Sequence, residues 1–245
     1  MYKVSQSLNS NLTKKPIIIF LCIGGALLNV AFNEINSLIG FPLYFDTVFT
    51  VTLTLLTGPL YGSLTGALTN IIANTIDFEY WGWMGYLFAI CNVATALITW
   101  LFVRLFPREL NLGRETSGAG FKDVSVAANF PSRRLDVIIS RLIVLILLSF
   151  VLCIAISILG GLLASFMRFM LTLSDVAAHN PASAKLGLTL FPQGLPVILV
   201  EILSRIPVNI IDRLITTFTG YGAALGLNFL FSVKRRALFL TEKRG

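Results

Sequence analysis

Thirty consecutive residues between Asp46 and Asp77 carry no charged side chain. Several other apolar runs also reach the roughly 20 residues that a helix needs to cross the hydrocarbon core of a bilayer. Of the 245 residues, 56% are hydrophobic and only 13% are charged. Soluble domains carry about 25% charge. The chain is therefore predicted to be an all-α membrane protein with a single polytopic domain, residues 1–245.

The excess positive charge, formally +7, lies beside the apolar runs. Lysine and arginine gather at Lys14 and Lys15, between Arg104 and Arg134, and from Lys234 to Arg236. This placement is typical of the cytoplasmic loops of membrane proteins. We therefore predict that the N-terminus, the loop 107–136 and the C-terminus are cytoplasmic. The same placement argues against nucleic acid as a partner.

Two segments on the same side of a membrane must be separated by an even number of crossings. The uncharged run satisfies this rule if it breaks at Gly58-Pro59 into two short helices, because proline disfavours a continuing helix and glycine suits a helix end. The last apolar run is similarly divided at Pro207, into an outer helical segment and a final helix. The sequence thus predicts six transmembrane helices, at about residues 16–39, 44–57, 59–76, 83–106, 137–173 and 207–231.

Gly58, Gly62 and Gly66 are spaced four residues apart, so they lie on one face of a helix. In a bilayer, small residues allow the close backbone approach on which helix association depends. We interpret this face as a packing seam inside the protein, with a seam for a partner protein as the alternative. Similar small-residue pairs occur in the fifth and the last predicted helix: Gly160 with Ala164, and Gly222 with Gly226.

Polar side chains at membrane depth are costly and usually face a cavity or a polar partner. In the predicted topology they come from four separate segments and converge on the outer side. Two interpretations stay open: a structural network of ion pairs and helix-bridging amides, or a pocket that binds a small solute from outside. The candidate substrate-binding residues are Asn33, Asp46, Asn70, Asn74, Asp77, Trp81, Glu201, Arg205, Asn209, Asp212 and Arg213.

The expected start of the final helix at Pro207 bears on the ligand. A helix that begins there would direct its free backbone N–H groups toward the pocket, next to Arg205 and Arg213. This arrangement predicts a ligand with an acidic or strongly hydrogen-bond-accepting group.

Motifs for catalysis or metal binding do not occur in the sequence. There is one histidine, His179, and neither a Gly-x-Ser-x-Gly nor a His-Glu-x-x-His pattern is present. The three cysteines each sit inside an apolar run and are interpreted as small core residues. We therefore expect no metal, no cofactor and no enzymatic activity. Without a Walker A loop, ATP-driven transport would need partner proteins.

Two stretches resemble the S components of energy-coupling factor (ECF) transporters, which are substrate-binding membrane subunits. Residues 42–72, PLYFDTVFTVTLTLLTGPLYGSLTGALTNII, are similar to their helix 2–helix 3 region, with an aromatic-Asp-Thr opening, a Gly-Pro turn and a Thr-Asn pair. Residues 206–225, IPVNIIDRLITTFTGYGAAL, are similar to their last helix, in which a proline precedes an aspartate followed by a basic residue.

The resemblance implies a multi-pass protein of a prokaryotic plasma membrane that captures a vitamin, a precursor or a nucleobase-like solute from outside. It also implies a transmembrane T component and cytoplasmic ATPases as partners. A membrane sensor or assembly module of the same fold, without transport, is the alternative. An intramembrane enzyme is the least favoured class.

Overall fold

The protein is built from helices alone in the part of the chain that the computed structural model describes, and no strand occurs there. The described residues are 15–40, 43–76, 78, 82–110, 112, 131–171, 189 and 194–242. Within these ranges, three helices are long and apolar enough to cross a membrane: Pro16–Ile39, Gly82–Leu105 and Leu135–Met167. The predicted all-α class is confirmed, and these helices indicate a membrane protein.

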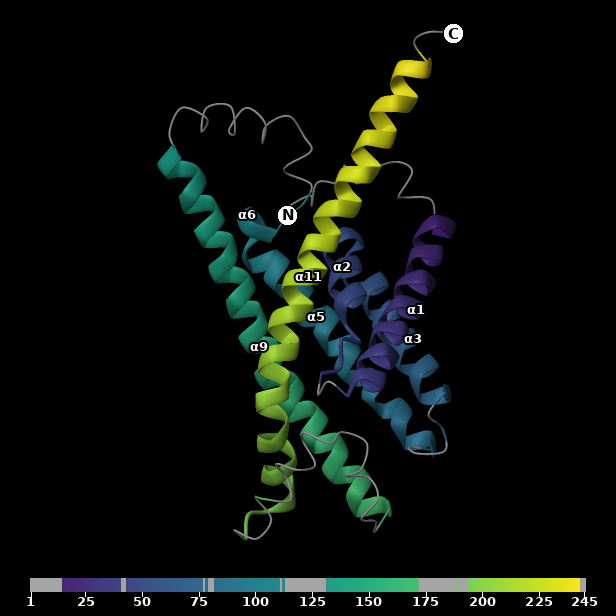
Figure 1. Cartoon of the computed structure of the whole chain (residues 1–245), viewed down its shortest axis with the longest axis vertical. Helices are drawn as coiled ribbons and strands as arrows, with labels where there is room; N and C mark the ends of the chain where they lie inside the picture. The colour runs from purple at the N-terminus through teal and green to yellow at the C-terminus, as the bar shows by residue number, and fades with distance from the viewer. Residues whose placement is uncertain are drawn as a thin grey trace.

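Successive long helices run in alternating directions (Figure 1). As a result, the first turn of the first helix and the last turns of the final one lie at the same end of the bundle. The elements in chain order are α1 (Lys15–Ile39), α2 (Val48–Thr57), α3 (Pro59–Ile76), the 3-10 helix η1 (Gly82–Phe88), α5 (Ala89–Leu105), α6 (Pro107–Leu110), α9 (Pro131–Leu171) and α11 (Val197–Glu242).

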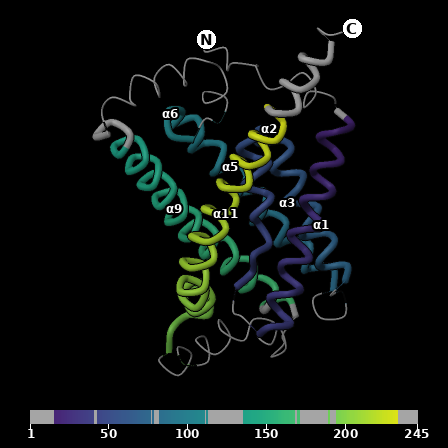
Figure 2. Tube along the Cα trace, turned by 45° about the horizontal axis from the view of Figure 1, so that its top comes forward, coloured from purple at the N-terminus to yellow at the C-terminus, as the bar shows by residue number. Residues whose placement is uncertain are grey.

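Helix α2 is the central helix and contacts α1, α3, α5 and α11 (Figure 2). The hydroxyl groups of its threonines donate hydrogen bonds to carbonyl groups one turn earlier in the same helix. Thr52 donates to the Val48 carbonyl at 2.8 Å, and Thr54 donates to the Thr50 carbonyl at 2.7 Å. These bonds let polar side chains sit in the core without an unpaired donor. The buried residues of α2 are Val48, Thr50, Val51, Thr52, Leu53, Thr54, Leu55 and Leu56.

The uncharged run breaks at Gly58, as the Gly-Pro pair predicts. Helix α2 ends at Thr57, Gly58 has a φ of 96°, and α3 begins at Pro59. The Gly58 N–H bonds to the Thr54 carbonyl at 3.0 Å, which satisfies one of the last carbonyls of α2. Two short antiparallel helices therefore replace one long crossing.

The glycine face of α3 is a packing seam inside the protein. A Cβ on Gly62 would lie 1.9 Å from Thr54 Oγ1 in α2. A Cβ on Gly66 would lie 3.0 Å from both the Cβ and the backbone oxygen of Asn92 in α5. These two glycines therefore let α3 approach α2 on one side and α5 on the other, and the packing interpretation is confirmed for them.

The pair predicted in the last helix does not form a seam. A Cβ on Gly222 or Gly226 would meet no atom within 4 Å. The close approach is made instead by Gly220, whose Cβ would lie 2.9 Å from the Val48 carbonyl oxygen. The reason is helical phase: the face of α11 that carries Gly220 and the buried Ala224 points at α2, and Gly222 is rotated away from it.

Helices α9 and α11 also meet at a glycine, one residue from the predicted one. A Cβ on Gly161 would lie 2.8 Å from the Cα of Ile202, which is too close for any side chain. The sequence pairs Gly160 with Ala164, but a Cβ on Gly160 would come no closer than 3.7 Å to Arg205 and 3.9 Å to the sulfur of Cys91, which are ordinary contact distances.

The predicted division of the last apolar run at Pro207 is wrong. Helix α11 runs without a break from Val197 to Glu242, with Pro207 inside it, and it does not end at Phe231. Proline removes one backbone hydrogen bond, but α11 packs on α9 and on α2, and such contacts allow a membrane helix to continue through a proline. The backbone N–H groups after Pro207 therefore lie inside a helix rather than at a free helix start.

Three other boundaries differ from the predicted ones. Helix α2 begins at Val48 rather than at residue 44, α9 begins at Pro131 rather than at 137, and the first turns of the fourth predicted helix form η1. At 41 and 46 residues, α9 and α11 are about 60 and 70 Å long, well beyond the roughly 30 Å hydrocarbon core.

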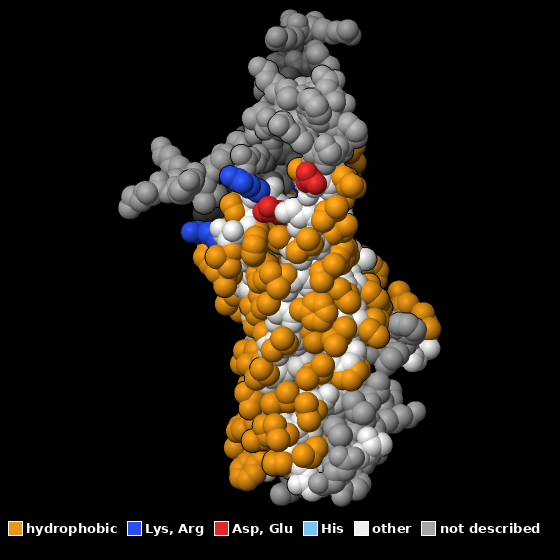
Figure 3. Space-filling model, turned by 90° about the vertical axis from the view of Figure 1, so that its left-hand side faces the viewer, with side chains coloured by type: hydrophobic (Ala, Val, Ile, Leu, Met, Phe, Trp, Pro, Cys, Tyr) orange, Lys and Arg blue, Asp and Glu red, His pale blue; other side chains and the backbone are white. Residues whose placement is uncertain are grey.

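The outer surface of α9 is covered with large apolar side chains (Figure 3). On the face in Figure 3, the visible lysine, arginine, aspartate and glutamate side chains gather toward one end, above a broad hydrophobic band. Exposed apolar surface on this scale marks an interface, and lipid is the partner that suits helices of this length. Exposed examples on α9 are Leu135, Val137, Ile138, Ile143, Phe150, Ile154 and Phe169.

Candidate functional site

A buried charged cluster forms where the linker 43–47 meets α11. Arg213 Nη2 lies 3.2 Å from Asp212 Oδ2 and 3.8 Å from Asp46 Oδ1, and Arg213 Nη1 donates a 2.6 Å hydrogen bond to Thr47 Oγ1. The side chains of Arg213 and Asp212 are 3% and 0% exposed, whereas that of Asp46 is 22% exposed. We refer to Asp46, Thr47, Asn92, Asp212 and Arg213 as the charged cluster.

Asn92 brings α5 into the charged cluster. Its Nδ2 donates to Asp46 Oδ2 at 3.2 Å and to the Gly66 carbonyl at 3.4 Å, so it links the linker, α5 and α3. Asn92 was not among the predicted site residues. The signal was present in the sequence, because an amide within the apolar span of α5 is costly unless it has polar partners.

The linker before α2 is shaped around the carboxylate of Asp212. Asp212 Oδ1 accepts hydrogen bonds from the backbone N–H groups of Tyr44 and Phe45, at 3.0 and 2.9 Å. Phe45 has a φ of 51°, a region that bulky residues seldom occupy. A helix requires a φ near −63°, so the backbone at Phe45 cannot belong to α2, which begins at Val48.

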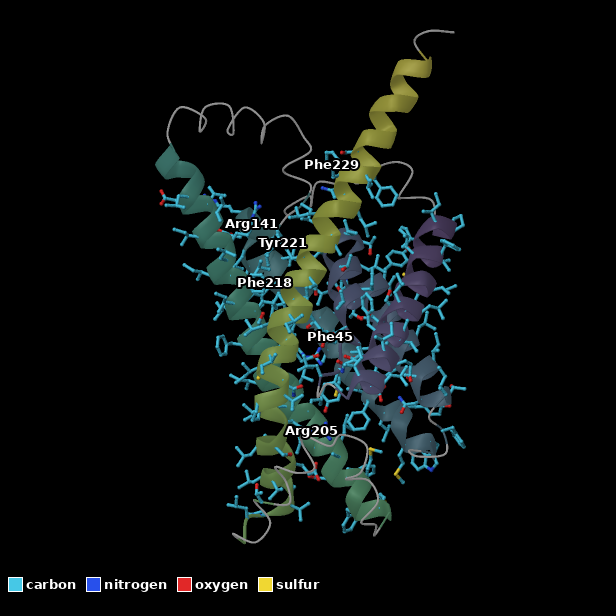
Figure 4. The ribbon with its side chains drawn as sticks, in the orientation of Figure 1. Phe45, Arg141, Arg205, Phe218, Tyr221 and Phe229 are labelled. Carbon is cyan, nitrogen blue, oxygen red and sulfur yellow. The ribbon has the colours of Figure 1, made fainter. Side chains whose placement is uncertain are left out.

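A second ion pair lies two turns earlier on α11. Arg205 Nη2 is 3.9 Å from Glu201 Oε2, so the predicted i,i+4 pair is confirmed. The Arg205 guanidinium also lies over the ring of Phe88, 5.7 Å from its centroid. Arg205 also lies near Cys91, the α5 residue before Asn92, because a Cβ on Gly160 would be within 4 Å of both side chains. In Figure 4, Arg205 and Phe45 lie toward the end where α1 and α3 finish.

The predicted amides do not join the charged cluster. Asn74 Nδ2 donates to Asn70 Oδ1 at 2.9 Å within α3, and Asn209 Nδ2 donates to Ser157 Oγ at 2.9 Å, between α11 and α9. Asn33 is half-buried on α1 and has no hydrogen bond to the described residues. For Asn70, Asn74 and Asn209 the structural interpretation therefore accounts for the contacts observed.

An amide outside the predicted set joins three helices. Asn29 on α1 is fully buried, and its Nδ2 lies 3.1 Å from Thr69 Oγ1 and 3.4 Å from Thr50 Oγ1. Its Oδ1 accepts a 2.9 Å hydrogen bond from the backbone N–H of Phe49. These contacts tie α1 to α2 and α3. Two of the predicted residues, Asp77 and Trp81, lie outside the described residues.

The charged cluster and its surroundings contain polar atoms that lack hydrogen-bond partners. Among the described residues, buried atoms of this kind include Asp46 Oδ1, Asp212 Oδ2, Arg205 Nε, Arg213 Nε and the Tyr44 hydroxyl. Unpaired donors and acceptors buried together are costly, and a polar small molecule can satisfy both kinds at once. In the described ranges, no group of three or more His, Cys, Asp or Glu residues could hold a metal ion.

Comparison of the chain with family models, with curated proteins and with solved structures finds no significant match.

Proposed function

We propose that this protein is the substrate-capture subunit of an ECF-type importer, which binds a small vitamin, precursor or nucleobase-like solute from the outer side. One observation carries the proposal: the two stretches that resemble S components meet at the charged cluster. Asp46 and Thr47 belong to the first stretch, Asp212 and Arg213 to the second, and Arg213 contacts both members of the first.

The chemistry of the site supports solute binding over a purely structural role. Buried ion pairs add little net stability, because desolvation offsets their attraction. Here the pairing is also incomplete: Asp46 Oδ1 and Asp212 Oδ2 both face the same Arg213 nitrogen, and neither accepts a hydrogen bond from the described residues. Buried polar groups that are left without hydrogen bonds in the empty protein are typical of a binding site. Buried ionisable groups that lie close to one another also gather at such sites.

The topology that we propose has six transmembrane helices, α1, α2, α3, α5, α9 and α11, with both chain ends in the cytoplasm. The alternating directions of these helices support it, as does the basic character of the loop 107–136. In this orientation α6 is cytoplasmic, and the start of α11 faces outside.

Cysteine labelling tests this orientation. Pro196 and Arg108 are both exposed and lie beside opposite ends of the bundle. In intact cells, an impermeant maleimide is expected to label Pro196→Cys and not Arg108→Cys, while both label in permeabilised membranes. The three native cysteines are buried, so the unsubstituted protein serves as the blank. If Arg108→Cys alone is labelled in intact cells, the protein has the opposite orientation to the one that we propose.

A thermal-shift screen tests solute binding. The purified protein in detergent is melted with water-soluble vitamins, their precursors and nucleobases. A true ligand at 100 times its Kd adds about 2.7 kcal/mol of stability. Arg205→Ala is expected to weaken its binding by about 1–3 kcal/mol, through loss of a buried donor. The control is Arg108→Ala, at an exposed position on α6. A screen in which no compound shifts the melting temperature would argue against solute capture.

Partner capture separates transport from sensing. An affinity-tagged chain extracted gently from its native membrane is expected to bring down a T component and ATPases. Recovery of signalling proteins in their place would favour the sensor or assembly module.

A further inference from the structure

The geometry points to a positively charged solute, recognised by the carboxylate of Asp46; this inference rests on the proposed function. The first argument is the charge count. Within the charged cluster, two carboxylates, those of Asp46 and Asp212, share one guanidinium group, that of Arg213. With both carboxylates ionised, the described residues of the charged cluster therefore carry one net negative charge.

The uncompensated charge is located at Asp46. Arg213 lies closer to Asp212, at 3.2 Å, than to Asp46, at 3.8 Å. Asp212 also accepts two backbone hydrogen bonds from the linker, whereas the side-chain hydrogen bond that Asp46 accepts is the 3.2 Å bond from Asn92. The other oxygen of Asp46, Oδ1, is buried and has no hydrogen-bond donor within the described part of the chain.

Asp46 is also the carboxylate that a solute can reach. Its side chain is 22% exposed, compared with 0% for Asp212 and 11% for Glu201. A buried carboxylate without full compensation is expensive, and an incoming cation removes that cost. An anion would add to the net negative charge and would have to displace a carboxylate from Arg205 or Arg213.

The neighbouring unpaired donors refine the class of solute. Arg205 Nε and the Tyr44 hydroxyl are buried without acceptors among the described residues. They can donate to acceptor atoms elsewhere on the same molecule. We therefore assign the site to a small organic cation that also carries hydrogen-bond acceptors. This replaces the acidic ligand predicted from a helix start at Pro207, because α11 has no start there.

Titration calorimetry on the full chain in detergent tests the assignment with a panel sorted by charge. Thiamine and choline are the cations, riboflavin and nicotinamide the uncharged compounds, and nicotinate and biotin the anions. Binding is expected for a cation only. Asp46→Asn, which keeps the size and one acceptor, should weaken it about tenfold or more. Asp136→Asn, at an exposed position of α9, should bind as tightly as the unsubstituted protein.

The empty protein supplies a second readout. Since Asp46 carries the uncompensated charge, Asp46→Asn is expected to melt at the same temperature as the unsubstituted protein or higher. If Asp46 only completes a structural ion pair, Asp46→Asn melts lower and leaves cation binding unchanged. Should the asparagine variant fail to fold, Asp46→Glu retains the charge and is expected to bind the cation.

Other outcomes separate the two proposals. Binding of an anion or an uncharged compound, with no cation bound, would leave solute capture standing and overturn the charge assignment. If none of the six compounds binds, the assignment is tested by the net charge of the ligand found in the thermal-shift screen. A cation supports the assignment, and an anion or an uncharged compound overturns it. If that screen also finds no ligand, both proposals fail. Stabilisation by sodium chloride but not by N-methylglucamine chloride, lost in Asp46→Asn, would assign the site to an inorganic cation and overturn the organic one.

Discussion

Arg213→Met is expected to lower the free energy of unfolding by about 3–5 kcal/mol, the usual cost of removing one partner from a buried ion pair. The arginine is 3% exposed and is shared by Asp46 and Asp212, so its loss removes the cation that both carboxylates contact. The hydrogen bond that it donates to Thr47 is also lost. The measurement is the unfolding midpoint in mixed micelles titrated with sodium dodecyl sulfate.

The matched control is Arg108→Met, which removes the same side chain from an exposed position and is expected to unfold like the unsubstituted protein. Adding Asp46→Asn and Asp212→Asn to Arg213→Met removes the uncompensated charges and should recover part of the lost stability. If Arg213→Met alone unfolds at the unsubstituted midpoint, the three charged groups are not buried together.

Gly62→Leu is expected to destabilise the bundle by about 1–3 kcal/mol or to prevent folding, because a side chain there forces α3 away from α2. Even a Cβ at this position would lie 3.0 Å from the Cα of Thr54, and backbone moves less readily than a side chain. The melting temperature in detergent reports the effect.

Gly222→Leu is the control for the glycine seam. It places the same side chain on α11 at an exposed position where a Cβ would meet no atom within 4 Å. We expect little change in melting temperature. Equal melting of both leucine variants would show that α3 does not pack on α2 through Gly62.

Local chemistry explains which parts of the fold were predictable. The break between α2 and α3 follows from two adjacent residues, Gly58 and Pro59, whose backbone preferences act at that point. Pro207 has the same local preference, yet α11 continues through it, because packing on α9 and α2 supports the helix on both sides. A proline alone does not reveal whether such neighbours exist.

The site was predictable in part for a similar reason. Ionisable residues in apolar runs are conspicuous, so Asp46, Asp212 and Arg213 could be identified from the sequence. Their partners could not be assigned, since Asp46 and Arg213 are 167 residues apart in the chain. The start of α2 was also missed, because the positive φ of Phe45 occurs where the linker binds Asp212, a residue far away in the chain.

Native mass spectrometry of the chain, released from detergent after gentle extraction from its own membrane, tests solute capture most directly. The expected spectrum shows the protein with one bound small molecule, whose mass identifies it, and the adduct is weakened or absent in Asp46→Asn. A spectrum in which the unsubstituted protein carries only lipid, under conditions that preserve known solute complexes, would contradict the account.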